Sequence, residues 1–285
     1  MALSLGAVAA LGLFGLLAYR TLIGGLPTTW HQRLTVVIDT PQGEVRGSAV
    51  TEITNREDDG LLQLPQTSGI RTTLHGEAVV VEVMPGQYLF VLLDGAETWA
   101  MRAFRLNDQA NPKDRTNRAV MTRLRNLPLE TPADLPPDAY PLFVTFADIT
   151  KPETVLRLDP ANLAATYGPG VNLDQVKLEI TSEQMTAGRV ESVLGWLTAI
   201  WPYNLNGESL FMLVEPNNPP ASYLSANSFS TEIKKMTVSK DLLLSILQVR
   251  ARIRSSKAGG CLVNHAPMLV ACERAFSVGK TRFFR

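Results

Sequence analysis

An uncharged apolar run at the N-terminus constrains this chain more than any other feature of its sequence. Residues 2–19 carry no charged side chain and are rich in Leu, Ala and Gly. Eighteen helical residues extend about 27 Å, close to the hydrocarbon thickness of a bilayer. Tyr19, Arg20 and Trp30 follow the run, where interfacial and snorkelling side chains are expected. We therefore expect residues 1–26 to form a transmembrane anchor that contacts the lipid bilayer through residues 2–19.

A cleaved signal peptide and a buried core helix are the alternatives for this run. A signal peptide has a positive n-region, a shorter apolar stretch and a small-x-small cleavage site. Here only the α-amine precedes the run, and the Ala7–Ala9 match to the cleavage pattern comes too early. An uncleaved anchor is the interpretation that we favour.

The rest of the chain divides by charge, although its formal net charge is zero. Residues 1–232 carry 16 Lys and Arg against 25 Asp and Glu, a net charge of −9, and residues 233–285 carry 11 against 2, a net charge of +9. The basic tail is predicted to form a helix over 239–254, with Ser239 as its N-cap. This helix either contacts anionic lipid or packs on the acidic body. Its phenylalanines are not interleaved with basic residues on strands, so nucleic-acid binding is not expected.

Between the anchor and the tail, the pattern predicts an α+β fold, a mostly antiparallel β-rich globular domain with a few short helices over residues 33–232. Alternating or continuous apolar runs predict two hairpins, and helical spacing marks other stretches. Five prolines among residues 127–141 indicate an ordered coil or a sub-boundary within the domain. The two predicted hairpins pair residues 33–39 with 44–53 and residues 76–83 with 88–93. Further strands are predicted at 142–146, 154–158 and 171–181. Helices are predicted at 97–106, 115–127, 162–166 and 186–200.

No stretch of the sequence carries a recognisable chemical motif. The three histidines, His31, His75 and His265, are far apart along the chain. Cys261 and Cys272 flank His265 at spacings that match no standard zinc site, and a fourth ligand is missing. The end of the chain, 279–281, resembles a phosphate loop but has Arg where the loop needs its first Gly. We therefore predict no catalytic, cofactor-binding or metal-ligating residue.

Three stretches of the body carry a resemblance to other proteins. They are LTVVIDTP with GSAV (34–41, 47–50), GEAV (76–79), and the run from Phe143 through VLRLDP (155–160) and LAATYGPG (163–170) to Thr186 and GWL (195–197). Through these stretches the body resembles a family of uncharacterised proteobacterial proteins with an N-terminal membrane helix and a β-rich domain. The resemblance covers about residues 1–232, and it implies an architecture and a Gram-negative source, and no activity.

Location and function follow from these features as expectations. Arg20 and Arg33 after the span favour a cytoplasmic body, whereas the resemblance implies a periplasmic one, which we prefer, in a single-pass protein of the bacterial inner membrane. The leading hypothesis is a non-enzymatic, membrane-tethered interaction or cell-envelope module with a protein partner in the envelope. The alternative is a hydrolase-like enzyme with a dispersed site. A pocket that gathers His75, Glu77 and other acids would favour the enzyme, and an exposed apolar patch or free sheet edge would favour the module.

Overall fold

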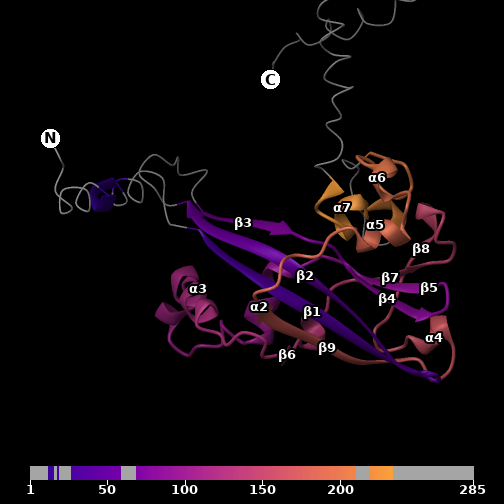
Figure 1. Cartoon of the computed structure of the whole chain (residues 1–285), viewed down its shortest axis with the longest axis horizontal. Helices are drawn as coiled ribbons and strands as arrows, with labels where there is room; N and C mark the ends of the chain where they lie inside the picture. Colours follow the sequence, from indigo (N-terminus) through magenta and orange to yellow (C-terminus); the bar gives the residue numbers. More distant parts are fainter. Residues whose placement is uncertain (1–11, 16–17, 19–26, 59–68, 210–217, 234–285) are drawn as a thin grey trace, which may run out of the picture. The chain divides into compact units, whose positions relative to one another are not determined.

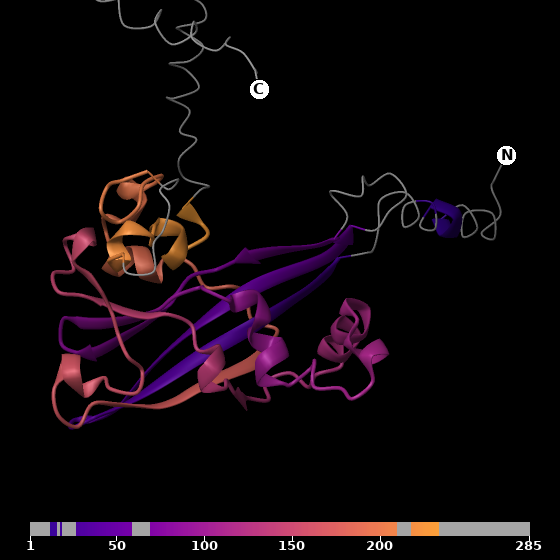
Figure 2. The ribbon, with the colours of Figure 1, turned by 180° about the vertical axis from the view of Figure 1, so that it is seen from behind.

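The computed structural model describes residues 12–15, 18, 27–58, 69–209 and 218–233. Residues 28–233 build two antiparallel β-sheets (Figures 1 and 2). Sheet A has the order β3-β2-β1-β9-β6, and sheet C has the order β4-β5-β7-β8. The antiparallel β-rich domain predicted from the sequence is therefore confirmed. The strands are β1 (Thr28–Thr40), β2 (Gly43–Asp58), β3 (Gly69–His75), β4 (Val79–Met84), β5 (Gln87–Val91), β6 (Ala133–Asp134), β7 (Phe143–Phe146), β8 (Val155–Arg157) and β9 (Asn172–Thr181).

A long hairpin of β1 and β2 forms the centre of sheet A. The two strands pair from Thr40↔Gly43 at the turn to Thr28↔Asn55 at the open end. Alternation sends every second residue of β1 into the core and turns His31 and Arg33 to the other face. The hairpin is longer than predicted, because β1 begins at Thr28 and pairs with β2 as far as Asn55, and β2 continues to Asp58 alongside β3.

Sheet C is buried on both faces. Leu89 and Val91 of β5 pack into a first core, between the two sheets, while Phe90 and Leu92 pack into a second core on the opposite side. This is the double burial that a continuous apolar strand predicts. The sheets approach most closely at Gly47, where a Cβ would collide with the carbonyl oxygen of Val80.

Short helices complete both cores. Residues of α2 (Ala96–Ala103) and α3 (Asn117–Arg125) pack into the first core, and residues of α5 (Arg189–Val193), α6 (Leu197–Ile200) and α7 (Ala226–Phe229) pack into the second. The hydroxyl of Thr116 caps α3 by accepting from Ala119 N. The single helix predicted over 186–200 is two helices, because the chain leaves helical geometry at Leu194. The remaining elements are α4 (Ala164–Tyr167) and the 3-10 turns Pro112–Arg115, Pro137–Ala139, Pro152–Thr154 and Pro220–Ser222.

The proline-rich stretch 127–141 runs along sheet A. Glu130 N donates to Ile180 O at 2.8 Å and Leu135 N donates to Val176 O at 2.9 Å, so the stretch follows β9. Leu135 is buried between these contacts and the first core. The sequence left this stretch as a coil or a sub-boundary, and the structure places it at the edge of the sheet.

The predicted fold class needs one correction, which concerns the transmembrane helix. Across the described residues, no helix is long and apolar enough to cross a membrane. Within 1–26 the description covers a helical stretch at 12–15 and residue 18. The other residues of 1–26, the helix predicted over 239–254, the cysteines and residues 279–281 lie outside the described residues.

Candidate functional site

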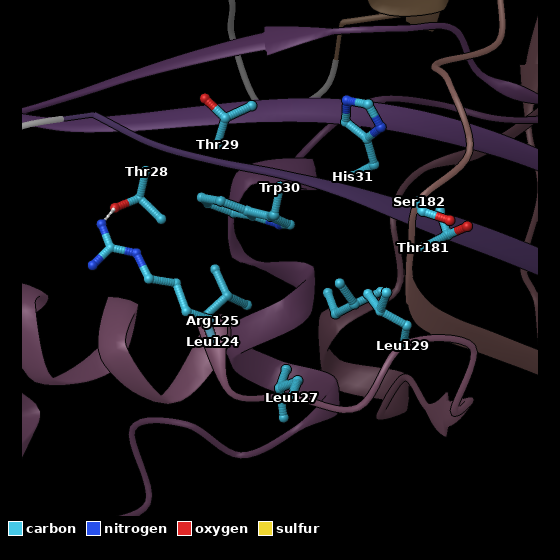
Figure 3. Close-up of a pocket in the computed structure, with 11 residues that line it drawn as sticks. Thr28, Thr29, Trp30, His31, Leu124, Arg125, Leu127, Leu129, Thr181 and Ser182 are labelled. Atoms are coloured by element: carbon cyan, nitrogen blue, oxygen red, sulfur yellow. Dashed lines mark hydrogen bonds between the residues drawn. The ribbon is translucent and has the colours of Figure 1, made fainter.

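A cavity of about 430 Å³ lies where β1 extends past the end of β9 (Figure 3). The last pair between these strands is His31↔Thr181, so Thr28, Thr29 and Trp30 continue beyond β9 while β2 still pairs with them on the other side. The C-terminal end of α3 and the chain that follows it form the opposite wall. We call this cavity the β1 notch.

The floor of the β1 notch is apolar. It is lined by Trp30, Leu124, Leu127, Leu129 and Ile180. Most of these side chains are buried, but Leu129 is 56% exposed at the rim. The indole N–H of Trp30 donates to Gln32 Oε1 at 3.2 Å, and Gln32 Nε2 donates to Ala96 O at 2.7 Å. Because these bonds fix the only polar atom of Trp30 inside the protein, the indole contributes hydrocarbon surface to the notch.

Polar groups occupy the rim of the notch, and they are already paired. Arg125 donates to Thr28 Oγ1, the dashed line in Figure 3. Thr29 Oγ1 shares a hydrogen bond of 2.8 Å with Thr54 Oγ1, and Thr181 Oγ1 donates to Glu130 Oε1 at 2.6 Å. The rim therefore offers oriented hydroxyl groups beside an apolar floor, an arrangement typical of binding pockets.

An ion-pair cluster on sheet A adjoins the notch. Arg33 Nη1 lies 2.6 Å from Glu179 Oε1 and 3.5 Å from Glu130 Oε2, and Arg33 Nη2 pairs with Glu183. Burial alone would lower the pKa of Arg33, but the hydrogen bond and charges of the surrounding carboxylates outweigh burial and raise this pKa above its ordinary value. The cluster ties the end of β9 to β1 and thereby fixes one side of the notch.

His31 has the position of a general base but not its contacts. Its Nε2 lies 3.0 Å from Glu52 Oε2, and its Nδ1 contacts the carbonyl oxygen of Glu183. Both ring nitrogens face acceptors, so neither faces the hydroxyl of Thr181 or Ser182. A nucleophile needs a base within hydrogen-bond reach. The geometry of the notch therefore supports binding and supplies no activated nucleophile from the residues described.

His75 and Glu77, whose meeting in one pocket would favour a hydrolase, make separate contacts outside the notch. His75 Nδ1 lies 3.4 Å from Glu232 Oε1. The buried Glu77 accepts from Arg189 N at 2.9 Å and Val190 N at 3.1 Å and so holds the start of α5. Burial raises the pKa of Glu77 and the charge of Glu191 adds to this, while the backbone hydrogen bonds oppose it.

Acidic residues of the described ranges do not assemble around a metal position either. Glu57 of β2 accepts from Asn117 Nδ2 at 2.8 Å. Within the described ranges there is no group of three or more His, Cys, Asp and Glu that could hold a metal ion. Sequence reasoning did not identify the β1 notch, because the first strand was predicted only from residue 33, whereas residues 28–31 of β1 line the notch.

Comparisons with known proteins add no family to this description. No protein-family model, no curated protein and no solved structure matches the chain. The resemblance to a proteobacterial envelope family stays a prediction from the sequence.

Proposed function

We propose that this protein is a non-enzymatic binding module whose β1 notch receives an aliphatic side chain from an extended segment of a partner protein. One observation carries the proposal: β1 continues three residues beyond its last β9 partner and lines an apolar cavity there. Extended peptides bind where a sheet offers a strand edge together with pockets for alternate side chains. The notch combines both features.

The apolar floor supplies the affinity in this proposal. Burying one aliphatic side chain fully contributes roughly 1.5–3 kcal/mol. Leu129 stands 56% exposed at the rim of the notch, so a bound side chain would cover it as well.

Charge around the notch defines the partner further. Four carboxylates face two guanidinium groups, which leaves an excess of negative charge and favours a segment with Lys or Arg beside its aliphatic residue. Glu130 and Glu183 are the more exposed acids, with side chains 48% and 60% exposed. The groups counted are Glu52, Glu130, Glu179, Glu183, Arg33 and Arg125.

A peptide selection tests this proposal. A displayed library of random peptides is selected on the full chain, and the affinity of enriched peptides is measured by calorimetry. We expect an aliphatic residue next to a basic one, binding that weakens as salt rises, and a loss of about tenfold or more for Leu129→Glu. Leu156→Glu is the matched control, because Leu156 of β8 is 48% exposed away from the notch. Peptides that bind both variants equally would refute the proposal.

The partner's location is part of the same proposal and rests on the sequence. We place the partner in the bacterial cell envelope, on the periplasmic side. Fusions of alkaline phosphatase and of a fluorescent protein that is active only in the cytoplasm, each joined after residue 232, distinguish the two sides. Fluorescence without phosphatase activity would move the partner to the cytoplasm and leave the peptide preference of the notch unchanged.

A further inference from the structure

A second cavity, separate from the β1 notch, lies where sheet C meets α2 and α7. Its volume is about 460 Å³, within the range of small-molecule sites. Five leucines from distant parts of the chain line it, and we call it the leucine pocket: Leu74, Leu92, Leu93, Leu142 and Leu224. Backbone hydrogen bonds from Leu92 N to Leu142 O at 3.0 Å and from Leu93 N to Ser228 O at 3.3 Å hold its walls together.

The charged groups of the leucine pocket are all acidic. Asp94 and Glu97 line it, and among the described residues its lining contains no Lys, Arg or His. Both side chains belong to exposed residues at its mouth. An organic cation that enters with its apolar part against the leucines would leave its charge beside these carboxylates. An anion would meet repulsion in the same place.

An unpaired hydrogen-bond acceptor in the lining also favours a ligand that carries an N–H group. Asn227 lines the leucine pocket, and its Oδ1 is buried without a hydrogen-bond partner in the described part of the chain. A buried acceptor left unpaired costs free energy that a ligand N–H would recover. Tyr223 also lines the pocket and offers the aromatic side chain that organic ammonium groups favour.

The start of α2 does not turn the leucine pocket into an anion site. Helix N-termini bind anions through free backbone N–H groups. Here Ala96 N already donates to Leu93 O at 3.1 Å, and Thr98 N donates to Gly95 O at 2.8 Å. Glu97 adds a negative charge to the first turn of α2. Two of the donors that an anion would need are therefore occupied, and the charge of Glu97 opposes an anion.

From these observations we infer that the leucine pocket binds a small organic ammonium compound with an apolar body. The leucines and Tyr223 hold the apolar body, Asn227 Oδ1 accepts from an N–H group, and Asp94 with Glu97 neutralises the charge. This site is independent of the peptide proposed for the β1 notch, since the two cavities share no lining residue.

Two probes of equal shape test the inference on the full chain. Hexylammonium and hexanol are titrated while the methyl NMR signals of Leu92 and Leu224 are followed. We expect hexylammonium to shift these signals saturably and to bind about tenfold or more tightly than hexanol. Asp94→Asn should weaken this preference, and Asp94→Asn combined with Glu97→Gln should abolish it, whereas Asp174→Asn, which removes another exposed charge from β9, should leave it unchanged.

Several results would overturn the inference. Equal affinity for the two probes would show an apolar cavity without charge recognition. A preference for hexylammonium that survives the combined Asp94→Asn and Glu97→Gln variant would place the recognition elsewhere. The absence of a saturable shift at Leu92 and Leu224 would exclude the site. Asp94 is exposed, so its variant is expected to fold, and an unchanged methyl spectrum without probe verifies this.

Discussion

Sheets A and C are built from similar strands and differ in what covers them. Sheet C has a core on each face, so β4, β5 and β7 carry almost only apolar side chains. Sheet A has a core on one face, and its other face carries His31, Arg33 and their acidic partners. Within the described part of the chain, both proposed sites accordingly lie at the ends of strands, where polar and apolar side chains meet.

The largest effect is expected from a truncation of a side chain inside sheet C. Phe90 is 0% exposed and meets Phe146 and Phe229 edge-on, with ring centroids 5.7 and 5.8 Å apart. We expect Phe90→Ala to lower the free energy of unfolding by about 3–5 kcal/mol, measured by denaturant titration. Thr35→Ala on the outer face of sheet A should change it by less than about 0.5 kcal/mol. A loss below about 1 kcal/mol for Phe90→Ala would contradict double burial of sheet C.

An intermediate effect is expected for the ion-pair cluster of sheet A. Arg33→Met leaves the three carboxylates around it facing one another, and we expect a loss of about 1–3 kcal/mol at neutral pH. The loss should shrink below pH ~4, where carboxylates become protonated. Arg46→Met is the control, because Arg46 pairs with Glu44 at an exposed position, and such pairs contribute about 0–1 kcal/mol. If the two variants lose equal stability, the cluster is an ordinary surface network.

The smallest effect concerns Glu77, a carboxylate enclosed between β4 and α5. Burial raises the pKa of folded Glu77 above its ordinary value of 4.5, so the folded state binds this proton more tightly than the unfolded state. Stability linked to Glu77 is then complete below pH 4.5 and declines as pH rises through the folded pKa. Glutamine does not titrate. The free energy of unfolding of Glu77→Gln, measured in urea, should therefore rise relative to that of the wild type between about pH 4 and pH 7. Glu97→Gln is the exposed control. If the stability of Glu77→Gln instead declines relative to the wild type as pH rises, the backbone hydrogen bonds to Glu77 outweigh its burial.

Much of the fold could be predicted from local patterns. The alternation of residues 44–53 predicts a strand buried on one face, and the continuous apolar run 88–93 predicts a strand buried on both faces. Either pattern can be recognised without knowing which segments cover the strand. The helix near 115–127 was predicted for the same reason, and its Thr116 cap confirms it. The periodicity of apolar residues was therefore sufficient to predict a strand or helix whose pattern lies within its own residues.

Contacts between distant segments could not be predicted in this way. Residues 186–200 have helical composition, yet the helix is interrupted, and its first turn at Arg189 is held by Glu77, more than a hundred residues earlier. The proline-rich stretch joins sheet A through backbone groups, which carry no residue-specific signal. The transmembrane helix was also predicted from apolar composition alone, and no helix of the described residues is long and apolar enough to cross a membrane. The β1 notch depends on the relative lengths of β1 and β9, and the leucine pocket on five leucines from four segments.

The position of β1 at the centre of sheet A has a consequence for synthesis on the ribosome. β2 follows β1 directly and pairs with it as soon as the hairpin emerges. The other edge of β1 waits for β9, since Arg33 and Glu179 are separated by 146 residues. At typical translation rates this interval lasts roughly 7–30 s. Throughout it, the nascent chain presents an unpaired strand edge beside Leu34, Val36 and Ile38, the kind of surface that strand-binding chaperones protect against misassembly.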